Sequence, residues 1–136
     1  MSARLRMSER RRVVACVIVG TLGCAVPAIG AACGACDEDM VAATYDHAVV
    51  SRAAAAGDVV VFCRIEGRFD GFRLSSVTRR IPGVRHASVR VSTELGALSF
   101  AVDSKRLSPR EAVATAQHAL RSNARLTIVS LVPAPS

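Results

Sequence analysis

Two cysteines near the N-terminus have the spacing of a soft-metal site. Cys33 and Cys36 are separated by two small residues, and a pair of thiolates at this spacing can bind one ion such as Cu(I) or Zn(II). Cys36 also precedes a predicted helix, whose dipole favours the thiolate form. Met40 and His47 follow on that helix, so the candidate metal ligands are Cys33, Cys36, Met40 and His47. On one continuous helix His47 would lie roughly 16 Å from Cys36, too far to share an ion unless the segment rearranges.

The same pair of cysteines has three other interpretations. In an oxidising compartment the two thiols can form a structural disulfide. Alternatively, Cys33 carries a lipid, because residues 30–33 (GAAC) resemble a bacterial lipobox, although a glycine stands where leucine is usual. A thiol-redox site is the third interpretation, since the pair precedes a helix as in thioredoxin-like motifs, but no thioredoxin βαβ unit surrounds it.

The other residues that could do chemistry indicate no catalytic site. Cys63 shares a strand face with Val61 and Ile65, which favours a buried core cysteine over a metal ligand. His86 and His118 are expected at the surface. The sequence has no nucleophile motif, no phosphate-binding loop and no acid–base pair at a defensible spacing, so it predicts a protein that is not an enzyme.

The first 32 residues have the order of a secretory signal peptide. Five arginines and one glutamate lie before residue 13, and an uncharged apolar stretch over 13–32 ends in small residues. Cleavage is predicted after Ala28, Ala31 or Ala32, although an uncleaved stretch of this length would also span a bilayer. The mature protein is therefore expected outside the cytoplasm, periplasmic or secreted. It would attach to a membrane only through a retained signal or as a lipoprotein acylated at Cys33.

The basic composition of the chain belongs largely to this signal. The 136 residues carry 18 Lys+Arg and 11 Asp+Glu, but from Cys33 onward 13 basic residues face 10 acidic ones, a net charge of +3. Nucleic-acid binding needs a concentrated basic patch and aromatic platforms for stacking. The chain has no Trp and one Tyr, so we exclude nucleic acid as a partner. The 104 residues after position 32 suffice for one domain.

Apolar periodicity predicts an extra N-terminal helix followed by a βαββαβ unit. The predicted elements are a helix over 40–56 capped by Asp37, a strand over 59–65, a helix over 72–81, strands over 84–92 and 97–102, a helix that Ser108 and Glu111 begin with a capping box, and a strand over 126–132. On the first helix, Val41, Tyr45, Ala48 and Val49 form the expected buried stripe. The chain thus divides into a signal (1–32), a cysteine-containing segment with a helix (33–58), a domain (59–132) and a tail (133–136). This element order is that of the ferredoxin-like α+β sandwich, an antiparallel sheet with two helices on one face.

The stretch 59–132 resembles the heavy-metal-associated domain family, which has a copper-chaperone-like fold. The residues that carry the resemblance are VVVFCRIEG (59–67), IPGVRHASVRVS (81–92), ALSFAVD (97–103) and LSPREAV (107–113). The resemblance implies the same fold and a soft-metal function. That family binds its ion through a Cys-x-x-Cys in the loop after the first strand, but here the loop reads EGRFDGF (66–72) and has no cysteine. No family ligand can be transferred, so the domain is expected to be a degenerate member.

We therefore predict an exported, non-enzymatic metal-binding protein for copper or a similar soft ion, with an envelope protein as a further partner. Two alternatives remain open. One is a periplasmic interaction domain that kept the fold and lost the metal, and the other is a small thiol-redox protein.

Overall fold

One four-stranded antiparallel sheet organises the protein. The computed structural model describes residues 36–132, so the predicted signal, Cys33 and the tail 133–136 lie outside the described residues. The strands are β1 (Val59–Gly67), β2 (Arg90–Ser92), β3 (Ala97–Val102) and β4 (Ala124–Val132), in the spatial order β2-β3-β1-β4. Since β1 pairs with both β3 and β4, it is buried in the middle of the sheet. The predicted α+β class is confirmed.

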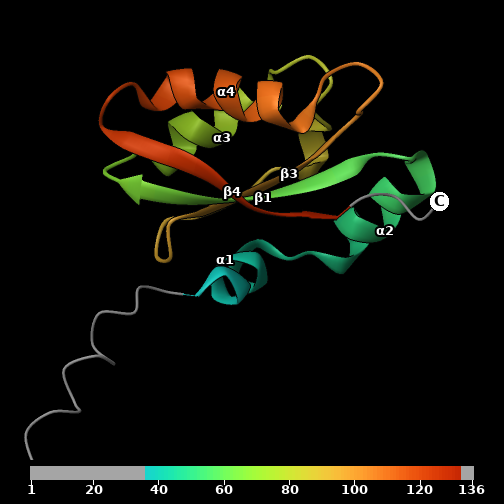
Figure 1. Cartoon of the computed structure of the whole chain (residues 1–136), viewed down its shortest axis with the longest axis horizontal. Helices are drawn as coiled ribbons and strands as arrows, with labels where there is room; N and C mark the ends of the chain where they lie inside the picture. The colour runs from blue at the N-terminus through green and yellow to red at the C-terminus, as the bar shows by residue number, and fades with distance from the viewer. Residues whose placement is uncertain (1–35, 133–136) are drawn as a thin grey trace, which may run out of the picture. The chain divides into compact units, whose positions relative to one another are not determined.

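Helices α3 (Gly71–Arg79) and α4 (Pro109–Leu120) cover one face of this sheet (Figure 1). Leu74 of α3 and Ala116 of α4 are buried against Val61 and Phe100 of the central strands, and together they anchor the larger core. Helix α4 begins as predicted, because Ser108 accepts a hydrogen bond from the Glu111 N–H at 3.2 Å and the Glu111 carboxylate accepts one from the Ser108 N–H at 3.1 Å.

The single helix predicted over 40–56 is wrong: two helices, α1 (Asp37–Thr44) and α2 (His47–Ala56), occupy this segment. Tyr45 and Asp46 between them have extended backbone conformations. The Asp46 carboxylate accepts hydrogen bonds from the N–H groups of Ala48 and Val49, so it starts a new helix rather than continuing the first. The sequence pattern of apolar residues did not reveal this competing cap.

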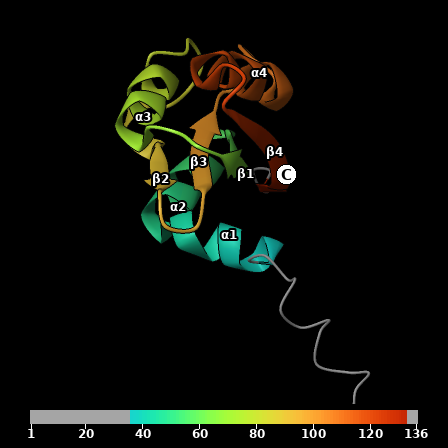
Figure 2. The same ribbon diagram turned by 90° about the vertical axis from the view of Figure 1, so that its left-hand side faces the viewer.

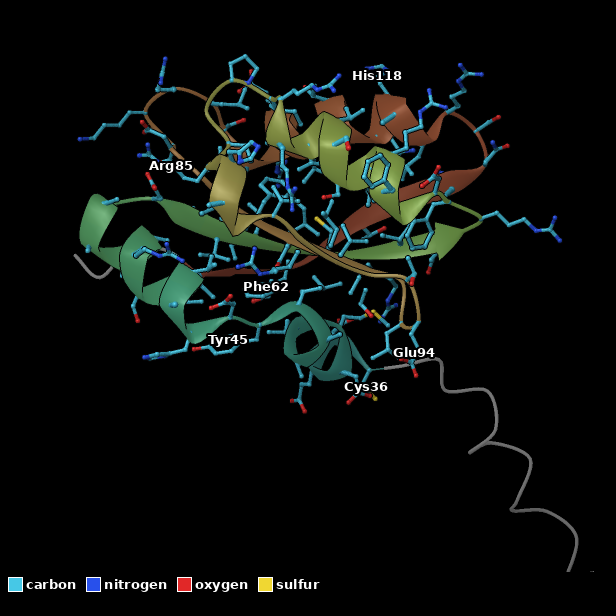
Figure 3. The ribbon with its side chains drawn as sticks, turned by 180° about the vertical axis from the view of Figure 1, so that it is seen from behind. Cys36, Tyr45, Phe62, Arg85, Glu94 and His118 are labelled. Carbon is cyan, nitrogen blue, oxygen red and sulfur yellow. The ribbon has the colours of Figure 1, made fainter. Side chains whose placement is uncertain are left out.

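Helices α1 and α2 pack on the other face of the sheet, as the edge-on view shows (Figure 2). Their buried residues are Met40, Thr44, Val49 and Ala53, so the predicted stripe is wrong at Tyr45, which is 50% exposed, and at Ala48. The Tyr45 ring stacks on Phe62 of β1 with centroids 6.5 Å apart (Figure 3). A second, smaller core therefore lies beneath these helices, formed by Ala53, Val60, Phe62 and Ala101.

The strand predicted over 84–92 is shorter than expected. The 3-10 helix η2 (His86–Ser88) interrupts it, so only the last three residues of the predicted strand form β2. A regular strand over 84–92 would turn Ala87 with Val89 and Val91 to one side and Ser88 to the other, but Ser88 is buried and Ala87 is exposed. The Ser88 hydroxyl donates to the Arg85 carbonyl at 2.6 Å and accepts from the Ala101 N–H at 2.8 Å, so a side chain replaces part of the strand ladder.

Other boundaries differ by a few residues. Strand β1 continues to Gly67, β4 begins at Ala124 and α3 ends at Arg79. Within residues 36–132, no helix has the length and apolar character needed to cross a membrane.

Candidate functional site

Cys36 stands at the N-cap of α1, at the point where the described chain begins. Its N–H donates to the Asp39 carboxylate at 3.2 Å, and three acids occupy the first turn that follows. The residue is exposed and its thiol is free (Figure 3). Solvent can therefore reach this sulfur, which retains its capacity to bind an ion.

The other predicted ligands within the described residues lie on α1 and α2. Met40 is 5% exposed and lies in the interior, between α1 and the sheet. His47 begins the second helix, is exposed, and places its Nε2 3.4 Å from the hydroxyl of Ser51. Cys33, the fourth predicted ligand, lies outside the described residues. Within residues 36–132, no group of three or more His, Cys, Asp or Glu side chains could hold a metal ion.

Cys63 lies inside the larger core, as predicted. Its side chain is 1% exposed, and burial raises the pKa of its thiol to about 12. A thiol that stays protonated is neither a nucleophile nor a metal ligand at neutral pH. His86 and His118 are exposed, also as predicted, and His118 lies on α4, across the sheet from Cys36 (Figure 3).

The segment between β1 and α3 has no cysteine, and an arginine cluster lies beside it. Asp70 caps α3 by accepting the Arg73 N–H at 3.1 Å. Arg68 and Arg73 line a cavity there together with Arg121, which follows α4. We did not predict this cluster from the sequence. The signal that could have revealed it is topological, because pairing of the first and last strands brings the segment after β1 beside the turn before β4.

Comparisons with family models, with curated proteins and with solved structures gave no match for this chain.

Proposed function

We propose that this chain is an exported, non-enzymatic protein that binds a soft metal ion through the thiols of Cys33 and Cys36. The observation that carries the proposal is the exposed, free thiol of Cys36 at the start of α1. Cys63 does not compete for this role, because its thiol is buried and its pKa is raised by burial. The proposed pair consists of Cys36, at the start of α1, and Cys33, three residues before it in the sequence.

Copper in its +1 state fits this pair better than zinc does. Structural zinc sites take four ligands, whereas soft thiolates select Cu(I) without needing a tetrahedral set. With Met40 buried and His47 on a separate helix, two of the four predicted ligands drop out of a site at Cys36. We therefore assign Met40 to the core and leave His47 outside the metal site.

We propose further that residues 59–132 have a ferredoxin-like fold. The order β2-β3-β1-β4, with α3 and α4 on one face, agrees with a ferredoxin-like arrangement of residues 59–132. This agrees with the resemblance to heavy-metal-associated domains, of which the chain would be a degenerate member whose cysteines precede the fold instead of occupying its first loop.

A second candidate is an exported interaction domain that has lost metal binding. The observation that favours it is that the loop over 66–72, where the resembled family carries its two cysteines, has no cysteine and contains Arg68. The third candidate, a thiol-redox protein, uses the same two thiols as the metal site and must be separated from it by experiment.

A competition titration with a chromogenic Cu(I) chelator tests the proposal on the reduced mature protein. We expect one equivalent of Cu(I) per chain, with binding weakened at least a hundredfold by Cys36→Ser and unchanged by Cys63→Ala. Undiminished binding in Cys36→Ser would contradict the proposed site. Loss of binding in Cys63→Ala would move the site into the sheet.

The redox alternative requires its own measurement. We expect the Cys33–Cys36 couple to catalyse thiol–disulfide exchange no faster than a simple dithiol of similar pKa does. Exchange well above that background, without copper binding, would favour the redox protein.

A further inference from the structure

A cavity of about 330 Å³ lies at one end of the sheet, between the segment after β1 and the end of α4. Strand β1 ends and β4 begins at this end, which is at the left in Figure 1 and faces the viewer in Figure 2. Three arginines line the cavity: Arg68 and Arg73 come from the segment after β1, and Arg121 comes from the turn after α4. Phe69 and Leu120 give it an apolar wall.

The backbone fixes these two segments against each other. The Arg68 N–H donates to the Asn123 carbonyl at 3.1 Å. Gly67, with a φ of +108°, permits this approach, since a Cβ at that position would collide with the same carbonyl oxygen. The arginines are thus carried on two connected segments whose spacing is set before any ligand arrives.

The cavity has a surplus of positive charge. Its lining residues include three exposed arginines and one acid, Asp70, whose carboxylate is already engaged as the cap of α3. The ion pairs within residues 36–132 involve Arg64, Arg85 and Arg90, and none of the three arginines of the cavity. Guanidinium groups offer forked donors that match the oxygens of phosphate and carboxylate groups.

Arg121 occupies a strained backbone position. It has φ +55° and ψ −135°, and it is the one non-glycine residue with positive φ within residues 36–132. The turn that contains it closes through a hydrogen bond from the Asn123 N–H to the Leu120 carbonyl at 3.3 Å. Glycine is the residue that such a conformation favours. The chain therefore places a guanidinium at the cavity at a cost to the stability of the fold, which is typical of functional positions.

We propose that this cavity binds a small organic phosphate. The phosphate group would be held by Arg68, Arg73 and Arg121, and the organic part would lie against Phe69 and Leu120. A phosphate monoester carries close to two negative charges at neutral pH, which matches three guanidinium groups offset by one carboxylate. The proposal involves none of the cysteines and is independent of the metal site.

Titration by NMR or calorimetry at constant ionic strength tests this, with phenyl phosphate, inorganic phosphate and benzoate as probes. We expect saturable binding of phenyl phosphate, at least fivefold tighter than that of inorganic phosphate, which lacks the apolar part, or of benzoate, which lacks the second charge. Benzoate binding as tightly as phenyl phosphate would contradict the phosphate assignment. No saturable binding of any probe would overturn the site itself.

Arg121→Gly separates a binding role from a structural one. Glycine relieves the strained φ, so we expect the variant to melt at a higher temperature and yet to bind phenyl phosphate at least tenfold more weakly. Arg110→Gln is the matched control, since Arg110 is an exposed arginine of α4 outside the cavity, and it should leave binding unchanged. Equal binding by Arg121→Gly and the unmodified protein would overturn the proposal, as would an equal loss in Arg110→Gln.

Cys36→Ser keeps the two proposals distinguishable. The variant should lose Cu(I) and retain phenyl phosphate, so failure of either proposal leaves the other standing.

Discussion

Cys36 and Cys63 are chemically different although both are free thiols. Cys36 lies in solvent at a helix N-terminus, whereas Cys63 is enclosed on β1 between the sheet and its covering helices. Burial disfavours the charged thiolate, which raises the pKa of Cys63 to about 12. Reactivity toward metals and electrophiles should therefore be confined to the N-terminal thiols.

Alkylation of the native protein at pH 8 checks this difference. We expect Cys36 to react with iodoacetamide at least a hundredfold faster than Cys63, because reaction requires both exposure and the thiolate. Peptide mapping at successive times measures both rates. Cys63 should become reactive once urea unfolds the chain, and rapid alkylation of Cys63 in the native state would show that it is not buried.

Asp46 makes stability depend on acidity. Its pKa is lowered first by the hydrogen bond from Arg90, and further by the N–H groups of Val49 and Ala48. A carboxyl group whose pKa is lower in the folded state contributes stability that is complete above its unfolded pKa of about 4. That contribution is lost as the pH falls through the folded value.

Asp46→Asn isolates this contribution, because asparagine still caps a helix but carries no charge. We expect the variant to be less stable than the unmodified protein from pH 5 to 7, and the difference to shrink as the pH falls below about 4. Urea unfolding at each pH measures it. A difference that stays constant down to pH 2 would mean that the charge of Asp46 is not responsible.

At the scale of elements, strand β4 is an edge strand, and α4 protects its beginning. The Gln117 side chain accepts the Leu126 N–H at 2.7 Å and donates to the Ala124 carbonyl at 2.8 Å. The amide thus takes the place of a neighbouring strand. Exposed edges of this kind promote association between chains, so their protection matters for solubility as well as stability.

Gln117→Ala removes both hydrogen bonds at once, together with a longer one that the amide donates to the Arg121 carbonyl at 3.4 Å. We expect the free energy of unfolding to fall by about 1–2 kcal/mol, since each bond contributes about 0.5–1.5 kcal/mol. Alanine is the better helix former, so a loss cannot arise from helix propensity. Urea unfolding measures the change, and light scattering should show more self-association. An unchanged stability would show that solvent replaces Gln117 without cost.

At the scale of the whole molecule, the sheet has two cores rather than one. Phe62 faces α1 and α2 and is 1% exposed, whereas Leu74 faces the opposite core and is also 1% exposed. If both layers belong to one cooperative unit, residues on either face should contribute comparably to stability.

Phe62→Ala tests whether the N-terminal helices are part of the folded unit. We expect a loss of about 3–5 kcal/mol in one unfolding transition, because truncating a buried phenylalanine leaves a cavity. Phe72→Ala is the matched control: Phe72 is 84% exposed, and its loss should fall within about 0.5 kcal/mol. Similar small effects at both positions would mean that α1 and α2 dock only loosely.

The sequence predicted the elements of residues 59–132 because their signals are local. Ser108 and Glu111 mark the start of α4. The run of apolar residues in β1 predicts a strand because both faces of this strand are buried. The break at Asp46, the 3-10 turn at Ser88 and the cluster around Arg121 escaped prediction, since each depends on side-chain or backbone contacts that periodicity does not contain. For the same reason, the sequence grouped Met40 and His47 with Cys36 without showing that Met40 is buried or that His47 begins a separate helix.

A native mass spectrum of the protein recovered from the cell envelope and loaded with Cu(I) tests the central claim most directly. We predict a chain without its signal and without an acyl group, carrying one copper ion that is lost when Cys33 and Cys36 are alkylated. An acylated Cys33, an uncleaved chain or a mature chain that retains no copper would contradict the account.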